Sequence, residues 1–533
     1  MQLVAYGAQD VYLTGNPQIT FWKVTYRRHT NFAMESIEQT FNGQADFGRR
    51  VQCTVSRNGD LAYRTYLQVT LPEINQSDGT TGQNSGAVLA RWLDCPGEQM
   101  ISMAEVEIGG QRIDRQYGDW MHIWNQLTLT SEQEAGYHKM IGHTTQLTYL
   151  CDPDFANVAT ACGAADVPEA VCAPRSALPE TTLYVPLQFW FCRNPGLALP
   201  LIALQYHEVK INIELRPLDE CLFAVSNVST TGTTNNKVTN AYAKSLVAAS
   251  LYVDYVFLDT DERRRMAQNP HEYLIEQLQY TGAESIGSSS NKIKLNFNHP
   301  CKELVWVVQP DMHVAYCDSF LQARTMHMAL GAQPFNYTDA VDALPNSIMA
   351  FGSAAQNKTV INADGLFNDL NADVSTNGTA ANGAALANDP NLGQITPNAA
   401  ATGVTDAGVF VLAETALNMH CWGENPVVTA KLQLNGQDRF SEREGTYFDL
   451  VQPYQHHTRA PDTGINVYSF ALRPEEHQPS GTCNFSRIDN ATLQLVVSAA
   501  AIGGTATAKV RVYATNYNVL RVMSGMGGLA YSN

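Results

Sequence analysis

The sequence has little positive charge for its size. Its 533 residues include 34 Lys and Arg against 51 Asp and Glu, so the formal net charge at pH 7 is −17. Sequence-independent binding of nucleic acid needs clustered Lys and Arg side chains that displace counterions from the phosphates. The charge balance therefore argues against direct contact with nucleic acid.

Long hydrophobic runs are absent from the sequence. We find no stretch of about 18 uncharged apolar residues, and the start, MQLVAYGAQD, lacks a basic stretch followed by an apolar run. We therefore expect a soluble, unprocessed chain. The eleven cysteines are an odd number, and several lie in apolar, strand-like runs, which favours free thiols in a reducing compartment. These are Cys53, Cys95, Cys192, Cys301 and Cys483.

Motifs for a metal site are also scarce. There is no His-x-His pair, and the rings of the adjacent His456 and His457 should diverge on an extended segment. His207-Glu208 and His271-Glu272 lack the second His of a zinc-protease helix. Three further cysteines are separated by ten and nine intervening residues, unlike the close pairs of a zinc knuckle. These are Cys151, Cys162 and Cys172. We expect no metal and no cofactor.

Motifs for catalysis are equally few. There is no Gly-x-Ser-x-Gly elbow, and the glycine-rich SGMGGL at Ser524 lacks a following helix or a P-loop Lys, so we expect it to be a flexible terminal arm. The carboxylates of Glu475 and Glu476 are adjacent and should point apart. The sequence therefore predicts no catalytic residue and no enzyme.

Strand patterns fill both halves of the chain. Val209, Ile211 and Ile213 alternate with polar residues, as in a half-buried antiparallel strand, and the aromatic run from Gln188 suggests another strand. Alternation before and after Asn58-Gly59-Asp60 predicts a hairpin. Many short strands with Gly, Pro and Asn turns favour an all-β fold of antiparallel sandwiches or jelly rolls, and the length favours two domains.

Helix signals are few. Trp120, Ile123, Trp124 and Leu127 recur at helical spacing. Ser131, with Glu134 three residues later, predicts a capping box for a second short helix.

One further helix signal lies between the two halves. Asp259 is a candidate N-cap, with Glu262 three residues later and Pro270 as a stop, so we expect a connecting helix there. The neighbouring arginines, 263–265, are interpreted as a solvated face or as partners in internal ion pairs.

A short internal similarity suggests duplication. EVEIGGQRID from Glu105 and AKLQLNGQDRF from Ala430 both run from an alternating strand into a Gly-Gln turn, and Gly110 and Gly436 are 326 residues apart. Polar stretches poor in apolar residues indicate exposed loops, the longest at 363–408. Shorter ones lie at 75–86, 155–180 and 226–240.

Eight collinear stretches resemble the major capsid proteins of the nucleocytoplasmic large double-stranded DNA viruses, the group of algal viruses, iridoviruses and giant viruses. The stretches cover nearly the whole chain. They include YLTGNPQITFWKVTYRRHTNFA from Tyr12, IGGQRIDRQYGDWMHIW from Ile108, VPLQFWFCRNPGLALPLIALQYHEV from Val185, LDTDERRRMAQNPHEYLIEQLQ from Leu258 and GINVYSFALRPEEHQPSGTCNFSRIDNATL from Gly464.

The resemblance implies a double jelly roll: two antiparallel β-sandwiches side by side, with a few short helices and long outward loops. The expected parts are an N-terminal arm at 1–25, a first jelly roll at 26–257, a helical linker at 258–272, a second jelly roll at 273–516 with an inserted loop at about 350–410, and a C-terminal arm at 517–533. The N-terminal segment is expected to face inward and the long loops outward.

The resemblance also implies a function. Three copies would form a pseudo-hexagonal trimer, the capsomer, that tiles the faces of an icosahedral shell in the virion. The implied partners are the chain itself, neighbouring capsomers, minor capsid or cement proteins, a penton protein and a nearby internal membrane, with assembly in the host cytoplasm. Because such an interface is distributed, we expect a single replacement, such as His457→Ala, to leave the trimer intact.

Two points stay open at the sequence level. A non-catalytic jelly-roll homologue used as a scaffold or carbohydrate-binding protein would have a similar sequence. Seven Asn-x-Ser/Thr sequons are present, and Asn336, Asn357 and Asn377 are the candidate glycosylation sites because they lie in or near the expected loops.

Overall fold

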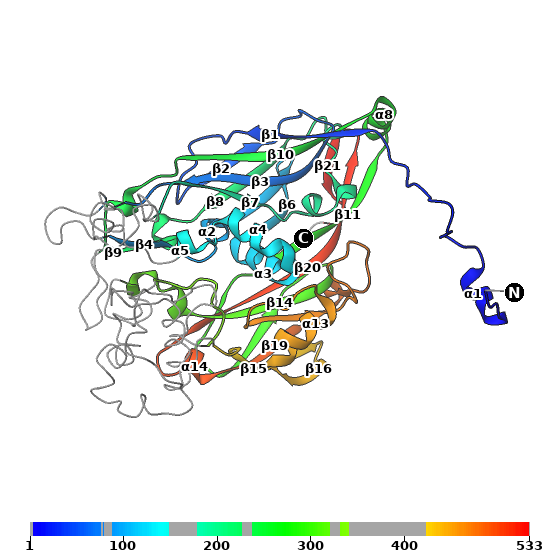
Figure 1. Ribbon diagram of the computed structural model, residues 1–533. Helices are drawn as coiled ribbons and strands as arrows, with labels where there is room; N and C mark the ends of the chain where they lie inside the picture. Colours follow the sequence, from blue (N-terminus) through cyan, green and yellow to red (C-terminus); the bar gives the residue numbers. More distant parts are fainter. Residues whose placement is uncertain are drawn as a thin grey trace, which may run out of the picture.

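The computed structural model describes residues 4–75, 78, 88–148, 178–225, 237–319, 331–339 and 423–531. These residues form two β-sandwiches, one above the other in Figure 1, with short helices between and beside them. The loop predicted at 363–408 and residues 155–177 of the loop predicted at 155–180 lie outside the described residues. Cys151, Cys162 and Cys172 also lie outside them. Within the described ranges, no helix is long and apolar enough to cross a membrane.

The first sandwich is built from two four-stranded antiparallel sheets, ordered β1-β10-β3-β7 and β2-β8-β5-β6, with a short β4-β9 ribbon beside them. Its strands are β1 (Phe32–Gln39), β2 (Arg50–Thr54), β3 (Leu61–Leu71), β4 (Leu89–Trp92), β5 (Ile101–Ile108), β6 (Gln111–Tyr117), β7 (Thr181–Pro186), β8 (Val209–Leu215), β9 (Leu222–Val225) and β10 (Ala248–Leu258).

The second sandwich pairs a larger sheet, ordered β11-β20-β14-β17 with β12, β18 and β21 attached, with a four-stranded sheet ordered β13-β19-β15-β16. Its strands are β11 (His271–Tyr280), β12 (Glu284–Ile286), β13 (Ser290–Leu295), β14 (Pro300–Pro310), β15 (Val427–Leu434), β16 (Gln437–Glu444), β17 (Ile465–Ser469), β18 (Cys483–Asn484), β19 (Ala491–Val497), β20 (Ala508–Met523) and β21 (Met526–Leu529).

The two sandwiches have the same connectivity. In chain order, β1, β2, β3, β5, β6, β7, β8 and β10 correspond to β11, β13, β14, β15, β16, β17, β19 and β20, and each corresponding pair occupies the same place in its sheet. An eight-stranded sandwich of this kind is a jelly roll. The expected double jelly roll is confirmed.

Alternating apolar residues form the core of each sandwich. Val51 and Cys53 on β2 face Leu67 and Val69 on β3 across the first core, and Leu493 lies in the second. The period-two patterns predicted from the sequence therefore identify the inward faces correctly.

The hairpin predicted at Asn58-Gly59-Asp60 is wrong. β2 pairs with β8 and β3 pairs with β10 and β7, so the chain crosses from one sheet to the other at this turn. Local turn chemistry is the same for a hairpin and for a crossing between facing sheets, and only the distant partner strands decide between them.

The internal similarity corresponds to two equivalent hairpins. β5 and β6 are joined at Gly109-Gly110, with φ of 58° and 83°, and β15 and β16 at Asn435-Gly436, with φ of 52° and 81°. Two successive residues with positive φ are typical of a type I′ turn, which suits Gly and Asn and matches the twist of paired strands.

The aromatic segment after Gln188 is not a strand. β7 ends at Pro186, and the aromatic residues form the short helix α7 (Trp190–Arg193). Phe189, Trp190 and Phe191 are all buried, so the segment has no exposed side to reveal its period.

Two helices follow β6 as predicted, α3 (Gly118–Thr128) and α4 (Ser131–Ile141). The capping box at Ser131 is wrong, because Thr130 is the N-cap and no side chain caps it. The described part of this domain also contains the α-helices α2 (Pro96–Met100) and α5 (Thr145–Thr148) and the 3-10 helices η5 (Pro195–Leu197), η6 (Leu218–Glu220) and η7 (Ala241–Ala243).

The helix α8 (Thr260–Gln268) connects β10 to β11. Asp259 is its N-cap, as predicted, since its carboxylate accepts from the backbone N–H of Glu262 at 2.9 Å. Arg263 lies 3.0 Å from the carboxylate of Asp60, which agrees with an internal ion pair.

The flexible C-terminal arm expected at 517–533 is wrong for the described part of that range. β20 continues to Met523, and a turn at Ser524-Gly525 leads into β21. Leu520 and Val522 are buried in the core of the first domain, so this strand crosses from one domain to the other. The alternating apolar residues of this segment, Leu520 and Val522, are buried, and their burial holds the segment in the sheet.

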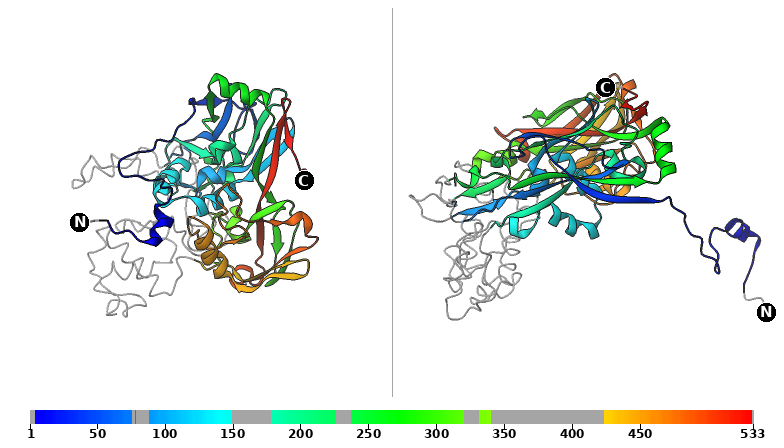
Figure 2. Two further views of the ribbon diagram at one scale, coloured as in Figure 1. Left: turned by 90° about the vertical axis from the view of Figure 1, so that its right-hand side faces the viewer. Right: turned by 90° about the horizontal axis from the view of Figure 1, so that it is seen from above.

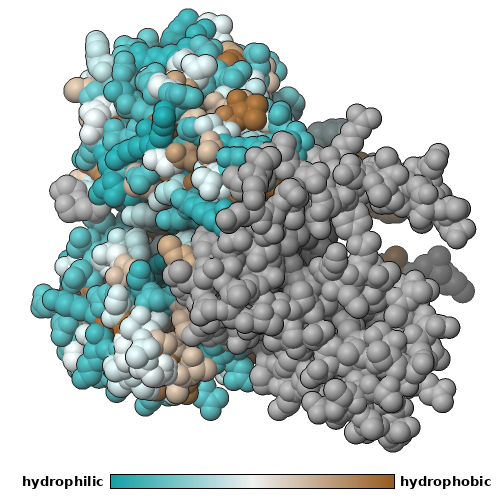
Figure 3. All heavy atoms as spheres, turned by 90° about the vertical axis from the view of Figure 1, so that its left-hand side faces the viewer, coloured by the Kyte–Doolittle hydropathy of each residue, from teal (hydrophilic) through white to brown (hydrophobic). Residues whose placement is uncertain are grey.

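At the other end, residues 4–31 extend away from both domains (Figures 1 and 2). Apart from Asp10 and Thr20, each of them is exposed. The segment holds the 3-10 helix η1 (Ala8–Asp10) and the single-turn helix α1 (Val11–Thr14). Seen from the left-hand side of Figure 1, the described surface is mostly hydrophilic with scattered apolar residues (Figure 3).

Candidate interaction surfaces and buried polar clusters

The joint between the two domains is apolar at its centre. Trp120, Ile123, Trp124 and Leu127 on α3 pack on the outer face of the large second sheet. That face is formed by Val305 and Val307 on β14, Ile465 and Val467 on β17, and Tyr513 on β20. The helical spacing read from the sequence therefore marks an interface between domains.

Ion pairs surround this apolar contact. Arg511 on β20 lies 2.8 Å from Asp119 at the start of α3, and Arg459 lies 2.6 Å from Glu134 on α4. Arg193 pairs with Glu276 on β11 at 3.1 Å, and its guanidinium stacks 4.1 Å from the ring of Trp124. Each of these three ion pairs joins a residue of the first domain to one of the second, so the two domains act as one body.

A buried carboxylate also belongs to the joint. Asp114 on β6 accepts from the backbone N–H of Leu278 on β11 at 3.1 Å. Burial raises the pKa of Asp114 to about 6, against the lowering effect of this hydrogen bond and of Arg193. Asp114 therefore helps to hold β6 against β11.

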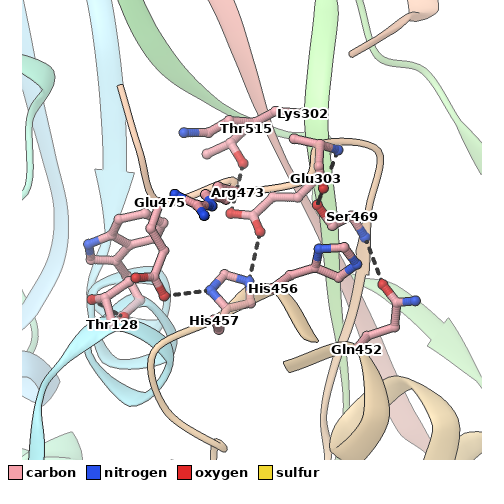
Figure 4. A network of polar contacts seen from close by, with 12 residues as sticks. Thr128, Lys302, Glu303, Gln452, His456, His457, Ser469, Arg473, Glu475 and Thr515 are labelled. Atoms are coloured by element: carbon pink, nitrogen blue, oxygen red, sulfur yellow. Dashed lines mark hydrogen bonds and ion pairs between the residues drawn. The ribbon is translucent and has the colours of Figure 1, made fainter. Parts of the chain in front are cut away.

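A second polar cluster lies inside the second domain (Figure 4). His457, just after the helix α13 (Gln452–His456), lies between Glu303 at 3.0 Å and Glu475 at 2.9 Å. Burial opposes protonation of His457, but Glu303 and Glu475 outweigh it and raise the pKa of His457 to about 9. His457 is therefore an imidazolium ion held between two carboxylates near neutral pH.

Nearby groups complete this cluster. Thr515 contacts Glu303 at 3.2 Å, and Lys302 Nζ lies 2.8 Å from Glu276. His456 faces elsewhere, with its Nδ1 3.0 Å from the carbonyl oxygen of Leu472. Glu476 pairs with Arg473. The rings of the two histidines and the carboxylates of the two glutamates diverge, as the sequence predicts.

One described group could offer three metal ligands: Cys95, Glu98 and His122, all buried. Glu98, however, accepts hydrogen bonds from His122 at 2.8 Å, Asn125 at 3.1 Å and Tyr137 at 2.5 Å. These donors satisfy the carboxylate, and burial raises the pKa of the Cys95 thiol well above its usual range. The arrangement fits a structural hydrogen-bond cluster better than a metal centre.

The other sequence candidates have structural contacts. The backbone N–H of Gly527 donates to His207 at 3.1 Å, and His271 lies at the start of β11 with Nε2 2.7 Å from the carbonyl oxygen of Met266. Burial raises the pKa of the Cys53 and Cys192 thiols to about 11, which disfavours a nucleophilic thiolate.

Of the candidate glycosylation sites, only Asn336 is described. It is half-buried, and its amide nitrogen donates to Gln333 at 2.7 Å while its oxygen accepts from Thr338. Asn357 and Asn377 lie outside the described residues.

The sequence reasoning missed one surface. The π-helix η13 (Tyr447–Val451) leads into α13, and together they expose Leu450, Val451 and Tyr454 to solvent. The sequence signal that could have predicted this surface is the spacing of Leu450, Val451 and Tyr454, which is the same as that of Ile123, Trp124 and Leu127 in α3.

Two family models match the chain: the N-terminal domain of the major capsid protein at residues 20–259, and the major capsid protein of large eukaryotic DNA viruses at 262–528. The chain is 75% identical over 541 residues to the major capsid protein of Phaeocystis pouchetii virus, covering all of this chain and 99% of the relative. It is 39% identical over 555 residues to that of Paramecium bursaria Chlorella virus 1, with the same coverage.

A solved structure agrees. The chain is similar to one in the quasi-atomic model of the PBCV-1 virus capsid, with a TM-score of 0.59, 33% identity, and coverage of 96% of this chain and all of the other. The strand order, the length and the sequence all agree with those of these proteins. The chain therefore belongs to the family of large eukaryotic DNA virus major capsid proteins.

Proposed function

We propose that three copies of this chain form a pseudo-hexagonal capsomer that tiles the faces of an icosahedral viral shell. The observation that carries the proposal is the strand-for-strand repeat of one jelly roll within the chain. Three chains with two similar domains each place six similar units around a three-fold axis. A nearly hexagonal outline can then pack side by side over a flat face.

The rigid joint between the domains supports this proposal. A capsomer that packs against its neighbours must keep its shape. In this chain, the contact of α3 with the second sheet and the strand β20 hold the two domains against each other. Neighbouring capsomers, minor capsid or cement proteins and a penton protein are the proposed partners, near an internal membrane and without direct contact with nucleic acid. We place the protein in the virion, after assembly in the host cytoplasm.

The domain limits remain part of the proposal. An N-terminal arm at 1–25 would face the inside of the shell. The two jelly rolls would span 26–257 and 273–516, and the linker at 258–272 would join them. The exposed apolar residues of the arm, such as Phe21 and Trp22, suit a segment that is covered only after assembly.

The first test is the solution mass by light scattering. The chain has a mass of 58.5 kDa, so a trimer has 3 × 58.5 = 175.5 kDa. A trimer with a hexagonal outline by electron microscopy supports the proposal. A monomer that stays monomeric at high concentration contradicts it and favours the alternative of a jelly-roll homologue used as a scaffold or carbohydrate-binding protein.

Glycosylation is tested separately. The mass of the intact protein from virions, followed by peptide mapping, shows whether Asn336, Asn357 or Asn377 carries a sugar. The hydrogen bonds of Asn336 predict that it is a poor acceptor unless its turn opens.

A further inference from the structure

The two domains each carry a helix at the same place in the fold. In the first domain α3 follows the β5-β6 hairpin, and in the second η13 and α13 follow the β15-β16 hairpin. A glycine stands at the start of each helical segment: Gly118 is the first residue of α3, and Gly445 is the first residue of the short helical stretch that leads into η13. A Cβ on Gly118 would meet the carbonyl oxygen of Ile101, the first residue of β5, and a Cβ on Gly445 would meet that of Val427, the first residue of β15. The two helices are therefore equivalent.

Counting from these glycines aligns the two helices residue by residue. Ile123, Trp124 and Leu127 lie five, six and nine positions after Gly118. Leu450, Val451 and Tyr454 lie five, six and nine positions after Gly445. The first three are buried at the joint between the domains. The second three are exposed by 56%, 38% and 86%. The same apolar face is thus covered in one domain and open in the other.

The surface that covers α3 also has an equivalent. α3 packs on the outer face of the sheet β11-β20-β14-β17, where Tyr513 on β20 lies opposite Val305 on β14. The corresponding sheet of the first domain is β1-β10-β3-β7. On its outer face, Tyr252 on β10 lies opposite Tyr66 on β3.

This second outer face is aromatic and open. The rings of Tyr66 and Tyr252 stack at 5.3 Å, as those of Tyr280 and Tyr513 do at 4.9 Å in the other domain. Tyr184 on β7 contacts Tyr66 edge-on at 6.2 Å and is 40% exposed, and Met34 on the edge strand β1 is 50% exposed. A tyrosine-rich patch that is partly exposed is well suited to an interface with another protein.

We propose that the helix face of Leu450, Val451 and Tyr454 in one copy packs on the outer face of Tyr66, Tyr184 and Tyr252 in the next copy. This proposal rests on the proposed trimer and names its contact surface. Within one chain, the first domain's helix covers the second domain's sheet. Between chains, the second domain's helix covers the first domain's sheet. The two contacts alternate around the ring, and such a head-to-tail contact closes into the proposed trimer when each copy is rotated by one third of a turn from the next.

The first experiment is a cross-link between the two surfaces. Tyr454→Cys and Tyr184→Cys are combined in the full chain, which is then oxidised and run on a denaturing gel without reductant. Covalent dimers and trimers are expected from the double variant only. Each single variant is the control, because Cys317 is exposed and supplies a background thiol.

The second experiment introduces charge at the same surface. Leu450→Glu with Tyr454→Glu is expected to raise the dissociation constant of the trimer at least about tenfold, because apolar residues at the centre of an interface carry much of the binding energy. The control is Val428→Glu on β15, an exposed apolar residue of the same domain outside this helix. Equal melting temperatures at low concentration, where all variants are monomers, show that they fold alike.

The outcomes separate this inference from the proposed function. Wild-type trimers that lose stability only in the Leu450 and Tyr454 variant, together with the cross-link, support both. Wild-type trimers that tolerate both glutamates overturn the helix contact and leave the capsomer proposal standing. A wild-type chain that never forms trimers overturns both.

Discussion

At the scale of single residues, the buried ionic cluster of the second domain contributes to stability through one histidine. His457 is fully enclosed between Glu303 and Glu475. Removing one partner of a buried charge cluster leaves the other charges without compensation, which costs more than the net contribution of the intact pair. We expect trimer assembly not to depend on His457, because the interface is distributed over many residues, whereas the burial of His457 makes it important for folding.

We expect His457→Ala to lower the free energy of unfolding by roughly 3–5 kcal/mol. The matched control is His456→Ala, because the neighbouring ring is half-buried and contacts only a carbonyl oxygen of Leu472 among the hydrogen bonds described for it. Chemical denaturation of both variants measures the difference. Equal stability of the two variants would show that the cluster contributes little.

The same residue predicts a pH dependence. The pKa of His457 is raised to about 9, above the ordinary value near ~6.5. Its contribution is therefore complete below ~6.5 and is lost as the pH rises through about 9. Between pH 7 and 9.5 the wild type should lose roughly 2.5 kcal/mol more than His457→Gln. Thermal unfolding of both proteins across this range checks the difference, and parallel curves would contradict it.

At the scale of elements, two glycines fix where a strand turns into a helix. A Cβ at Gly445 would overlap the carbonyl oxygen of Val427, so the helix η13 can start there only without a side chain. Gly118 has the same role before α3. Close packing of backbone against backbone explains these glycines, since neither has a positive φ.

We expect Gly445→Ala to lower the free energy of unfolding by about 1–3 kcal/mol, as overpacking does in well-packed sites. Gly136→Ala is the matched control in α4, where a Cβ would meet no atom within 4 Å. That control should stabilise the protein by about 0.4–1 kcal/mol, because alanine restricts the unfolded chain. Similar losses in both variants would refute the close-packing argument. Urea unfolding curves give both values.

The elements also show which parts of the fold the sequence could predict. Alternation in β8, β13 and β19 and the turn at Asn435-Gly436 are local patterns, and all appear where predicted. The crossing at Asn58-Gly59 and the helix at Trp190 were wrong because partner strands and all-round burial are set by distant residues. The role of the exposed helix face at Leu450 could not be predicted from the sequence, because it is inferred from the equivalence of this helix to α3 in the other domain.

At the scale of the whole molecule, the joint between the domains determines whether the chain behaves as one body. The centre of that joint is Trp124, which packs under Arg193 and beside Trp120. The strand β20 adds a covalent path between the cores, since Leu520 and Val522 lie in the first core and Val510 and Val512 in the second. The apolar contact of α3 with the second sheet is the other connection between the two jelly rolls.

We expect Trp124→Ala to cost about 3–5 kcal/mol and to split one cooperative thermal transition into two, because the domains then unfold separately. Calorimetry of the monomer at low concentration is the measurement. Tyr454→Ala is the matched control, because it removes the third residue of the equivalent helix face, which is open in the single chain. That control should keep the melting curve of the monomer and weaken only the trimer. A single unshifted transition for Trp124→Ala would mean that β20, not α3, joins the domains.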